Sequence, residues 1–152
     1  MIRGSAGRVA RNETTIDAPL DAVWAVLEDP FAYPKWVVGT DRTLQADPDF
    51  PAPGSAFQVH IALGLKDDTR VVEFERRRKI VLDAAASAFG PARVTIETEA
   101  RGDRTHVALI EDPHGKMFFW KYFPPAHLGI KLRNVESLRR FERLVRARSV
   151  PA

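Results

Sequence analysis

Apolar and polar residues alternate with a period of two through the middle of the chain, which is typical of half-buried β-strands. Phe57, Val59 and Ile61 share one face of such a segment, whereas Gln58 and His60 fall on the other. Turn-forming pairs separate the segments, among them 67–68, 90–91 and 102–103. The pattern predicts strands at residues 9–16, 37–46, 55–64, 70–77, 80–89, 92–100 and 105–111.

Helical spacing appears in two places, one near each end of the chain. Leu20, Val23, Trp24 and Leu27 form an apolar face directly after Pro19, and residues 31–36 can add a short helical turn. Residues 126–148 read as a long amphipathic helix, whose predicted buried stripe is Leu128, Leu132, Val135, Leu138, Phe141 and Val145. The order of elements predicts an α+β domain with one curved antiparallel sheet.

The chain has 152 residues, the usual size of a single domain, and contains neither an internal repeat nor a low-complexity segment. We expect a flexible tail at residues 1–7 and one domain at residues 8–149. No apolar run approaches the roughly 18 residues of a membrane span, and residues 1–11 contain no apolar stretch like a signal-peptide core. These features predict a soluble, cytoplasmic protein without integral membrane contact.

Several kinds of chemistry find no support in the sequence. Cysteine is absent, which excludes disulfides, thiolate metal sites and cysteine nucleophiles. The four histidines lack the spacing of a helical metal site, and neither a nucleophile elbow nor a glycine-rich phosphate loop is present. We therefore expect no metal and no cofactor.

Three segments together resemble the START/polyketide-cyclase (SRPBCC) superfamily, in its polyketide cyclase/dehydrase-like branch. They are Ile16–Trp24, which resembles the beginning of the first helix of that family, Asp29–Trp36, which resembles the following short helix, and Leu132–Leu138, which resembles the start of the C-terminal helix. The resemblance spans residues 9–148. It implies a helix-grip fold, in which a curved antiparallel sheet wraps around a long C-terminal helix, with two short helices after the first strand. It also implies a mostly apolar cavity for lipids, polyketides or other hydrophobic ligands.

Strand parity indicates which side chains face that cavity. If Ile80 and Leu82 point inward, so do Ala84, Ala86 and Ala88, and such small side chains leave room opposite the long helix. Close packing of the helix on the sheet is the alternative, because small residues permit it as well. We expect the ligand-binding residues to be Trp24, Phe57, Val59, Ile61, Arg70, Val72, Phe74, Leu82, Ala84, Ala86, Val94, Ile96, Val107, Leu109, Phe118, Trp120, Asn134 and Leu138.

Glu111 is the one candidate for acid or base chemistry. It shares the inward face of Val107 and Leu109, and a buried carboxylate needs a partner or a changed pKa. It either acts on a ligand or forms a structural ion pair with an arginine, for which Arg70 and Arg133 are the candidates. We favour the ion pair, because structural ion pairs also perturb pKa values and a changed pKa is therefore no sign of catalysis by itself.

The loop at residues 115–125 is unusually rich in aromatic residues, including Phe118 and Trp120. These side chains fit a lid over the cavity, a satellite core under the long helix, or a homodimer contact. The sequence leaves the three alternatives open, and with them the oligomeric state.

The leading functional prediction is binding of a small hydrophobic ligand, a lipid, polyketide or aromatic molecule, with or without a cyclase or dehydratase activity. The alternative is an interaction module, resembling the Hsp90-activator-like or coenzyme-Q-binding and ribosome-associated branches. The net charge of +3 and the arginine-rich segments at 76–79 and 133–148 would suit an acidic partner. We expect no DNA binding, since the basic excess is small.

Overall fold

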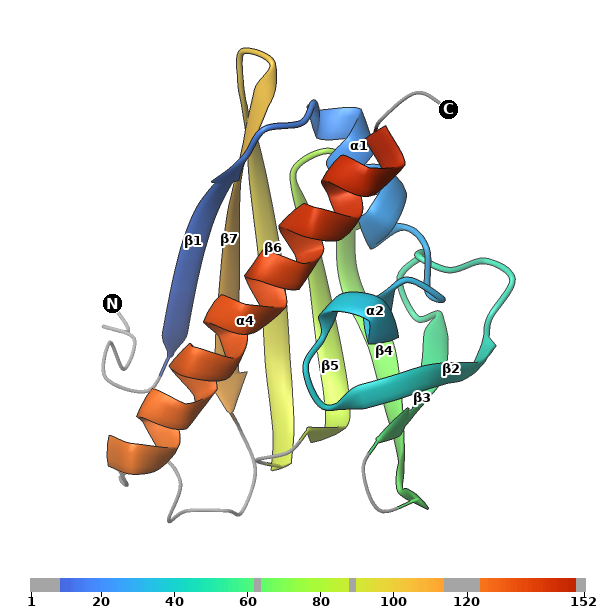
Figure 1. Ribbon diagram of the computed structural model, residues 1–152. Helices are drawn as coiled ribbons and strands as arrows, with labels where there is room; N and C mark the ends of the chain where they lie inside the picture. The colour runs from blue at the N-terminus through green and yellow to red at the C-terminus, as the bar shows by residue number, and fades with distance from the viewer. Residues whose placement is uncertain (1–8, 62–63, 88–89, 114–123, 150–152) are drawn as a thin grey trace, which may run out of the picture.

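The computed structural model describes residues 9–61, 64–87, 90–113 and 124–149 (Figure 1). One strand is followed by two short helices, six further strands and a long helix. The elements are β1 (Ala10–Ile16), α1 (Leu20–Leu27), α2 (Tyr33–Trp36), β2 (Thr40–Ala46), β3 (Ala56–Ile61), β4 (Lys66–Glu75), β5 (Lys79–Ser87), β6 (Gly90–Arg101), β7 (Arg104–Pro113) and α4 (Pro124–Ser149). Each predicted strand and helix is present, with ends that differ by a few residues.

The seven strands form one antiparallel sheet in the order β1-β7-β6-β5-β4-β3-β2. Strands β2 to β7 pair with their neighbours in sequence, as expected for a meander, and β1 pairs with β7 so that Ile16 lies opposite Thr105. The sheet is curved and unclosed, and α4 crosses its concave face (Figure 1). This arrangement confirms the predicted α+β class and the helix-grip fold.

The two short helices cover one end of the concave face, beside the C-terminal half of α4 (Figure 1). Trp24 of α1 is anchored to β6, because its indole N–H donates a hydrogen bond of 2.9 Å to the hydroxyl of Thr98. The hydroxyl of Thr105 in β7 donates to the carbonyl of Ala18 at 2.9 Å and holds the start of α1 in the same way. None of the helices in the described parts of the chain has the length and apolar content needed to cross a bilayer.

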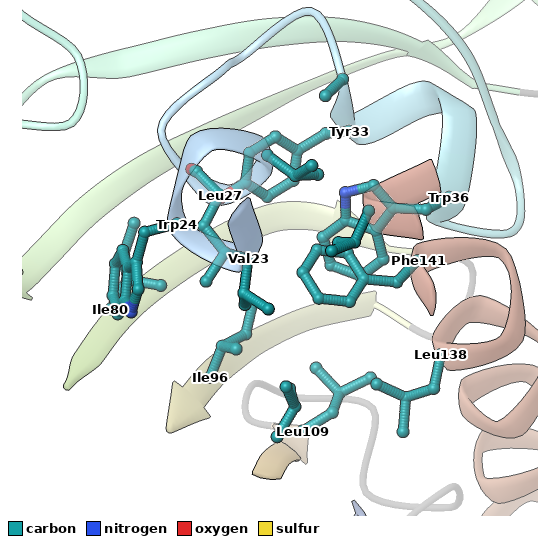
Figure 2. Close-up of a cluster of buried hydrophobic side chains, with 14 of the residues drawn as sticks. Val23, Trp24, Leu27, Tyr33, Trp36, Ile80, Ile96, Leu109, Leu138 and Phe141 are labelled. Carbon is teal, nitrogen blue, oxygen red and sulfur yellow. The ribbon is translucent and has the colours of Figure 1, made fainter. Parts of the chain in front are cut away.

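Large side chains fill the space at this end (Figure 2). The rings of Trp36 and Phe141 lie edge to face with centroids 4.9 Å apart, and those of Trp24 and Phe74 lie 5.8 Å apart. Trp24, Trp36 and Phe141 are all buried. Buried aromatic side chains contribute much of the stability of a core, so the fold is held together chiefly here.

The predicted stripe of α4 is wrong in its first half. Leu128 and Leu132 are 57% and 62% exposed. The buried residues of α4 still follow helical spacing, and they are Ile130, Asn134, Ser137, Leu138, Phe141 and Val145. Two of these are polar, which is why the spacing of apolar residues alone indicated the wrong face.

Strand β4 also differs from the prediction. The pair Asp67-Asp68, predicted as a turn, lies within the strand. The alternation of β4 buries Asp67, Thr69 and Val71, so these three side chains lie on the concave side of the sheet.

Arg70 and Val72 consequently point outward, and their predicted inward orientation is wrong: Val72 is 41% exposed. The pairing of β4 with β5 shifts by one residue between Val71 and Glu73. Such a bulge reverses the alternation of faces beyond it, and half-buried Phe74 is therefore on the inner face although Val72 is not.

Candidate functional site

A cavity of about 470 Å³ lies between the sheet and the N-terminal half of α4. Its volume is within the range of about 300–1,000 Å³ that is usual for small-molecule sites. Residues of α2, the segment leading into β2, six strands and α4 form its wall. They are Tyr33, Trp36, Val37, Val38, Gly39, Thr40, Phe57, Val59, Ile61, Leu65, Asp67, Thr69, Leu82, Ala84, Val94, Ile96, Leu109, Glu111, Arg133, Asn134 and Ser137.

The floor of the cavity is apolar and built from the middle strands. Val94 of β6 lies opposite Leu82 of β5, and Ala84 occupies the next inward position of β5. Because the alanine side chain is short, it leaves space that a leucine would fill. The facing part of α4 presents Asn134 and Ser137 instead of large apolar residues, so the gap between helix and sheet stays open.

Tyr33 and Trp36 bring aromatic rings to the wall of the cavity from α2. The Tyr33 hydroxyl donates a hydrogen bond of 2.8 Å to the carbonyl of Leu27. Burial raises the pKa of Tyr33 above its usual range, with a further contribution from the nearby carboxylates of Asp29 and Glu28. Its phenol is therefore neutral at physiological pH and acts as wall and anchor rather than as a base.

The polar part of the wall is centred on Glu111, whose residue is 3% exposed. Its Oε2 accepts hydrogen bonds from Arg133 Nη2 at 2.5 Å and from Asn134 Nδ2 at 3.1 Å. The Arg133 side chain is itself only 16% exposed. The sequence offered Arg70 and Arg133 as partners for this carboxylate, and Arg133 makes the pair.

This cluster joins α4 to the far strand of the cavity wall. Glu111 is on β7, while Arg133 and Asn134 are consecutive residues of α4. One turn further along the helix, the Ser137 hydroxyl accepts a hydrogen bond of 3.1 Å from the backbone N–H of Val38. Polar residues thus fix the distance of α4 from both sides of the cavity, where apolar side chains would draw the helix onto the sheet.

Ten of the residues named from the sequence line the cavity: Phe57, Val59, Ile61, Leu82, Ala84, Val94, Ile96, Leu109, Glu111 and Asn134. Nine of them come from β3, β5, β6 and β7, where simple alternation identified the inner face. Asn134 of α4 belongs to the segment Leu132–Leu138 that carried the family resemblance. Lining the cavity is a statement about position, and their contact with a ligand stays a prediction.

The other named residues are elsewhere. Trp24, Val107 and Leu138 are buried in the packed core outside the cavity lining, and Phe74 packs against Trp24. Arg70 and Val72 face outward, as described above. Phe118, Trp120 and the side chain of Ala86 lie outside the described residues, as does most of the aromatic loop at 115–125.

Sequence reasoning missed the wall formed by residues 33–40 together with Asp67 and Thr69. No local sequence pattern indicates that the segment after α2 faces the cavity, because its position depends on how α2 packs against β2 and α4. Asp67 and Thr69 could have been found, because they precede Val71 with a period of two.

Within the described residues, no group of three histidine or acidic side chains is placed to hold a metal ion. The polar groups that the cavity wall offers to a ligand are hydrogen-bonding side chains. They are the Glu111 cluster, Thr40, Thr69, Ser137 and the buried Asp67.

The fold and the cavity together define a helix-grip protein with an internal, mostly apolar chamber. Residues 8–143 match the family described as polyketide cyclase/dehydrase and lipid transport, and the chain belongs to this family. No curated protein matches the sequence closely.

Solved structures share the fold at low sequence identity. The protein MLL2253 from Mesorhizobium loti is 19% identical with a TM-score of 0.72, covering 95% of this chain and 100% of its own. NE0264 from Nitrosomonas europaea is 16% identical with a TM-score of 0.72, covering 95% and 97%. DynU16, described as a protein of the dynemicin biosynthetic locus, is 17% identical with a TM-score of 0.70, covering 91% of this chain and 47% of its own.

Proposed function

We propose that this protein binds a small hydrophobic molecule, a lipid, polyketide or aromatic compound, in the cavity between the sheet and α4. The observation that carries the proposal is a chamber of about 470 Å³ with a largely apolar wall and one buried polar cluster. Ligand sites typically combine an apolar lining with a few placed polar groups that fix orientation. A core evolved only for stability would fill such a volume with side chains.

The family description, which names polyketide cyclases, dehydrases and lipid transport, supports the same class of ligand. The biosynthetic locus of DynU16 is in keeping with it. Fold alone does not select a function, so the proposal rests on the cavity first.

A cyclase or dehydratase activity is the second candidate, and the buried carboxylate of Glu111 in the cavity wall is the observation that favours it. A general acid or base must lie within hydrogen-bonding reach of the reacting atoms. If Glu111 has that role, Glu111→Gln abolishes turnover and leaves binding in place. Unchanged turnover in this variant would assign Glu111 to binding and stability alone.

The arginine run at 76–79 gives little support to an interaction module with an acidic partner. Arg76 pairs with Glu28 at 2.9 Å, and Arg77 pairs with Asp21. Arg78 pairs with Glu75. Since acidic side chains of this chain already face the run, its charge is largely balanced before any partner arrives.

The proposal is tested by titrating the protein with N-phenylnaphthylamine, an uncharged probe whose fluorescence rises in apolar surroundings. We expect saturable binding of one probe per chain, weakened several-fold by Ala84→Leu, which fills the floor. The matched control is Ala100→Leu, the same change at an exposed position of β6. Absence of saturable binding, or equal weakening by both substitutions, contradicts the proposal.

Native mass spectrometry of the purified protein complements this titration. It reports a copurified ligand by its mass, and it distinguishes a monomer from the homodimer that the sequence left open.

A further inference from the structure

The two oxygens of the Glu111 carboxylate have different surroundings. Oε2 accepts the hydrogen bonds of both Arg133 and Asn134. Oε1 accepts none from any residue in the described parts of the chain, although the Glu111 residue is 3% exposed and lines the cavity. Oε1 is not among the buried polar atoms that lack a partner, so it is open to the cavity that Glu111 lines. A ligand that brings a donor to it can form a hydrogen bond with a charged acceptor, which is stronger than one between neutral groups.

The charge around Glu111 restricts what that donor can be. Arg133 Nη2 lies 2.5 Å from Oε2, so the carboxylate and the guanidinium largely cancel each other's charge. A ligand ammonium group would place a second cation beside an already neutralised pair and lose its own hydration. A ligand carboxylate would meet the acceptor-only oxygen of Glu111 and be repelled. A neutral hydroxyl fits both conditions.

The residues next to Glu111 in the sheet indicate what the rest of the ligand must be like. Val94 lies directly opposite Glu111 in the pairing of β7 with β6, and Leu82 lies opposite Val94 in the pairing of β6 with β5. The inner surface is thus apolar from β6 to β5 beside the carboxylate. A flat apolar body can lie on this floor while its edge reaches Oε1.

Building on the proposed function, we infer that the cavity selects an apolar molecule bearing a neutral hydroxyl group, a phenol or an alcohol, whose O–H donates to Glu111 Oε1. The Glu111 carboxylate is then the specificity-determining group of the site. The pair with Arg133 keeps it oriented, with Oε2 turned to the helix and Oε1 left for the ligand.

This arrangement makes a sharp prediction for Glu111→Gln. Two donors, on Arg133 and Asn134, converge at the position of Oε2, so the amide oxygen of the glutamine must take that place. The amide NH₂ then occupies the position of Oε1. The group that faces the ligand changes from an acceptor into a donor, and the preference for a hydroxyl donor is lost without a change in shape.

The test measures dissociation constants for β-naphthol and for its methyl ether at neutral pH. The ether keeps the ring and the oxygen but has no O–H to donate. In the wild type we expect the naphthol to bind more tightly, and in Glu111→Gln we expect the ratio of the two constants to fall by about tenfold, the loss of one hydrogen bond to a charged acceptor. The control is Glu99→Gln, the same change at an exposed carboxylate of β6, which should leave the ratio unchanged.

Each outcome has a distinct meaning. If both probes bind and the ratio is the same in wild type and Glu111→Gln, the inference is wrong while the proposed function stands. If neither probe binds to the wild type, the proposed function fails and the inference with it. Tighter binding of β-naphthoate than of β-naphthol also overturns the inference, because it would assign recognition to Arg133.

A second variant guards against misfolding of Glu111→Gln. Glu111→Leu combined with Arg133→Leu removes both charges together, which avoids leaving either one buried alone. This double variant should bind the naphthol and the ether with nearly equal affinity. A wild-type ratio in the double variant contradicts the inference as clearly as it would in the single one.

Discussion

The same sheet and the same helix form both halves of the concave face, but the half beside α1 is closely packed and the half at the beginning of α4 contains the cavity. Beside α1, the helix presents Phe141 and Val145, and Trp24 fills the space between helix and sheet (Figure 2). Trp36 lies between the two halves, because it packs against Phe141 and also lines the cavity. Toward the beginning of α4, the helix presents Arg133, Asn134 and Ser137, and the floor presents Ala84. The first half is closely packed, whereas the second half keeps a volume of about 470 Å³ open.

The comparison shows how a small domain can hold a cavity without losing its fold. An empty or solvent-filled volume costs stability, because its wall lacks packing partners. The closely packed aromatic end compensates for that cost. Two hydrogen bonds hold α4 at its distance where apolar packing is weak: Asn134 donates to Glu111, and Ser137 accepts from the backbone N–H of Val38.

The largest effect is expected from removing an aromatic ring at the packed end. Phe141→Ala should lower the free energy of unfolding by about 3–5 kcal/mol, because it leaves a hole beside Trp36. Leu132→Ala on the same helix should cost less than about 0.5 kcal/mol, since Leu132 is exposed. Urea denaturation of both variants checks the pair of values. Equal losses would contradict the burial of Phe141 in a closely packed core.

The Glu111 cluster should give the next largest effect. Glu111→Gln replaces a charged acceptor of two hydrogen bonds by a neutral one, and we expect a loss of about 1.5–3 kcal/mol. Glu99→Gln should have almost no effect, because the Glu99 side chain is exposed and 3.7 Å from its partner Arg101. Chemical denaturation at neutral pH measures both, and a Glu111 variant as stable as wild type would show that the ion pair does not position α4.

A pair of alanine substitutions compares the free volume of the two halves directly. Ala32→Leu, at a fully buried position of the packed core, should cost about 1–3 kcal/mol through overpacking. Ala84→Leu should cost less than about 1 kcal/mol, because its added methyl groups enter the cavity. Thermal unfolding of the two variants gives the comparison. A larger loss at Ala84 than at Ala32 would contradict an open cavity beside β5.

The smallest expected effect is a change in the pKa of Glu13, which lies on the outer surface away from the cavity. A hydrogen bond from His106 at 3.0 Å, followed by one from Arg11, lowers the pKa of Glu13 below its ordinary value of 4.5. A carboxylate with a lowered pKa stabilises the fold above about pH 4.5, and this contribution disappears as the pH falls through the folded-state pKa. In His106→Gln, the titration midpoint of Glu13 followed by NMR should rise toward 4.5. An unchanged midpoint would remove His106 as the main cause.

Much of the fold could be predicted because it depends on patterns close in sequence. Alternation located the inner residues of β3 and β5 to β7, and the spacing of Leu138, Phe141 and Val145 located the packed half of α4. The same reasoning identified Glu111 as buried and named Arg133 among its partners. All of these features except the partner of Glu111 follow from one segment read by itself.

The parts of the fold and the site that were not predicted depend on hydrogen bonds, a bulge and helix docking, which hydropathy does not encode. The first half of α4 turns Asn134 and Ser137 inward because they bond to other elements, so Leu128 and Leu132 are exposed. The bulge after Val71 reverses the faces of β4, and a strand read without its partner does not reveal it. The wall at residues 33–40 results from the docking of α2. The incorrect predictions, at the first half of α4, at β4 and at residues 33–40, therefore concern the surroundings of the cavity. Functional sites are where local sequence preferences are expected to fail.

The most direct test of the account is an NMR titration that follows methyl groups from both halves of the concave face. As N-phenylnaphthylamine is added, the methyl signals of Leu82, Ile96 and Leu109, which line the cavity, should shift in a saturable manner. Those of Val26, Leu27 and Val145 at the packed end should stay within the experimental error. Equal shifts at the packed end, or static signals from Leu82 and Leu109 while the probe saturates, would contradict the division into a packed half and a binding half.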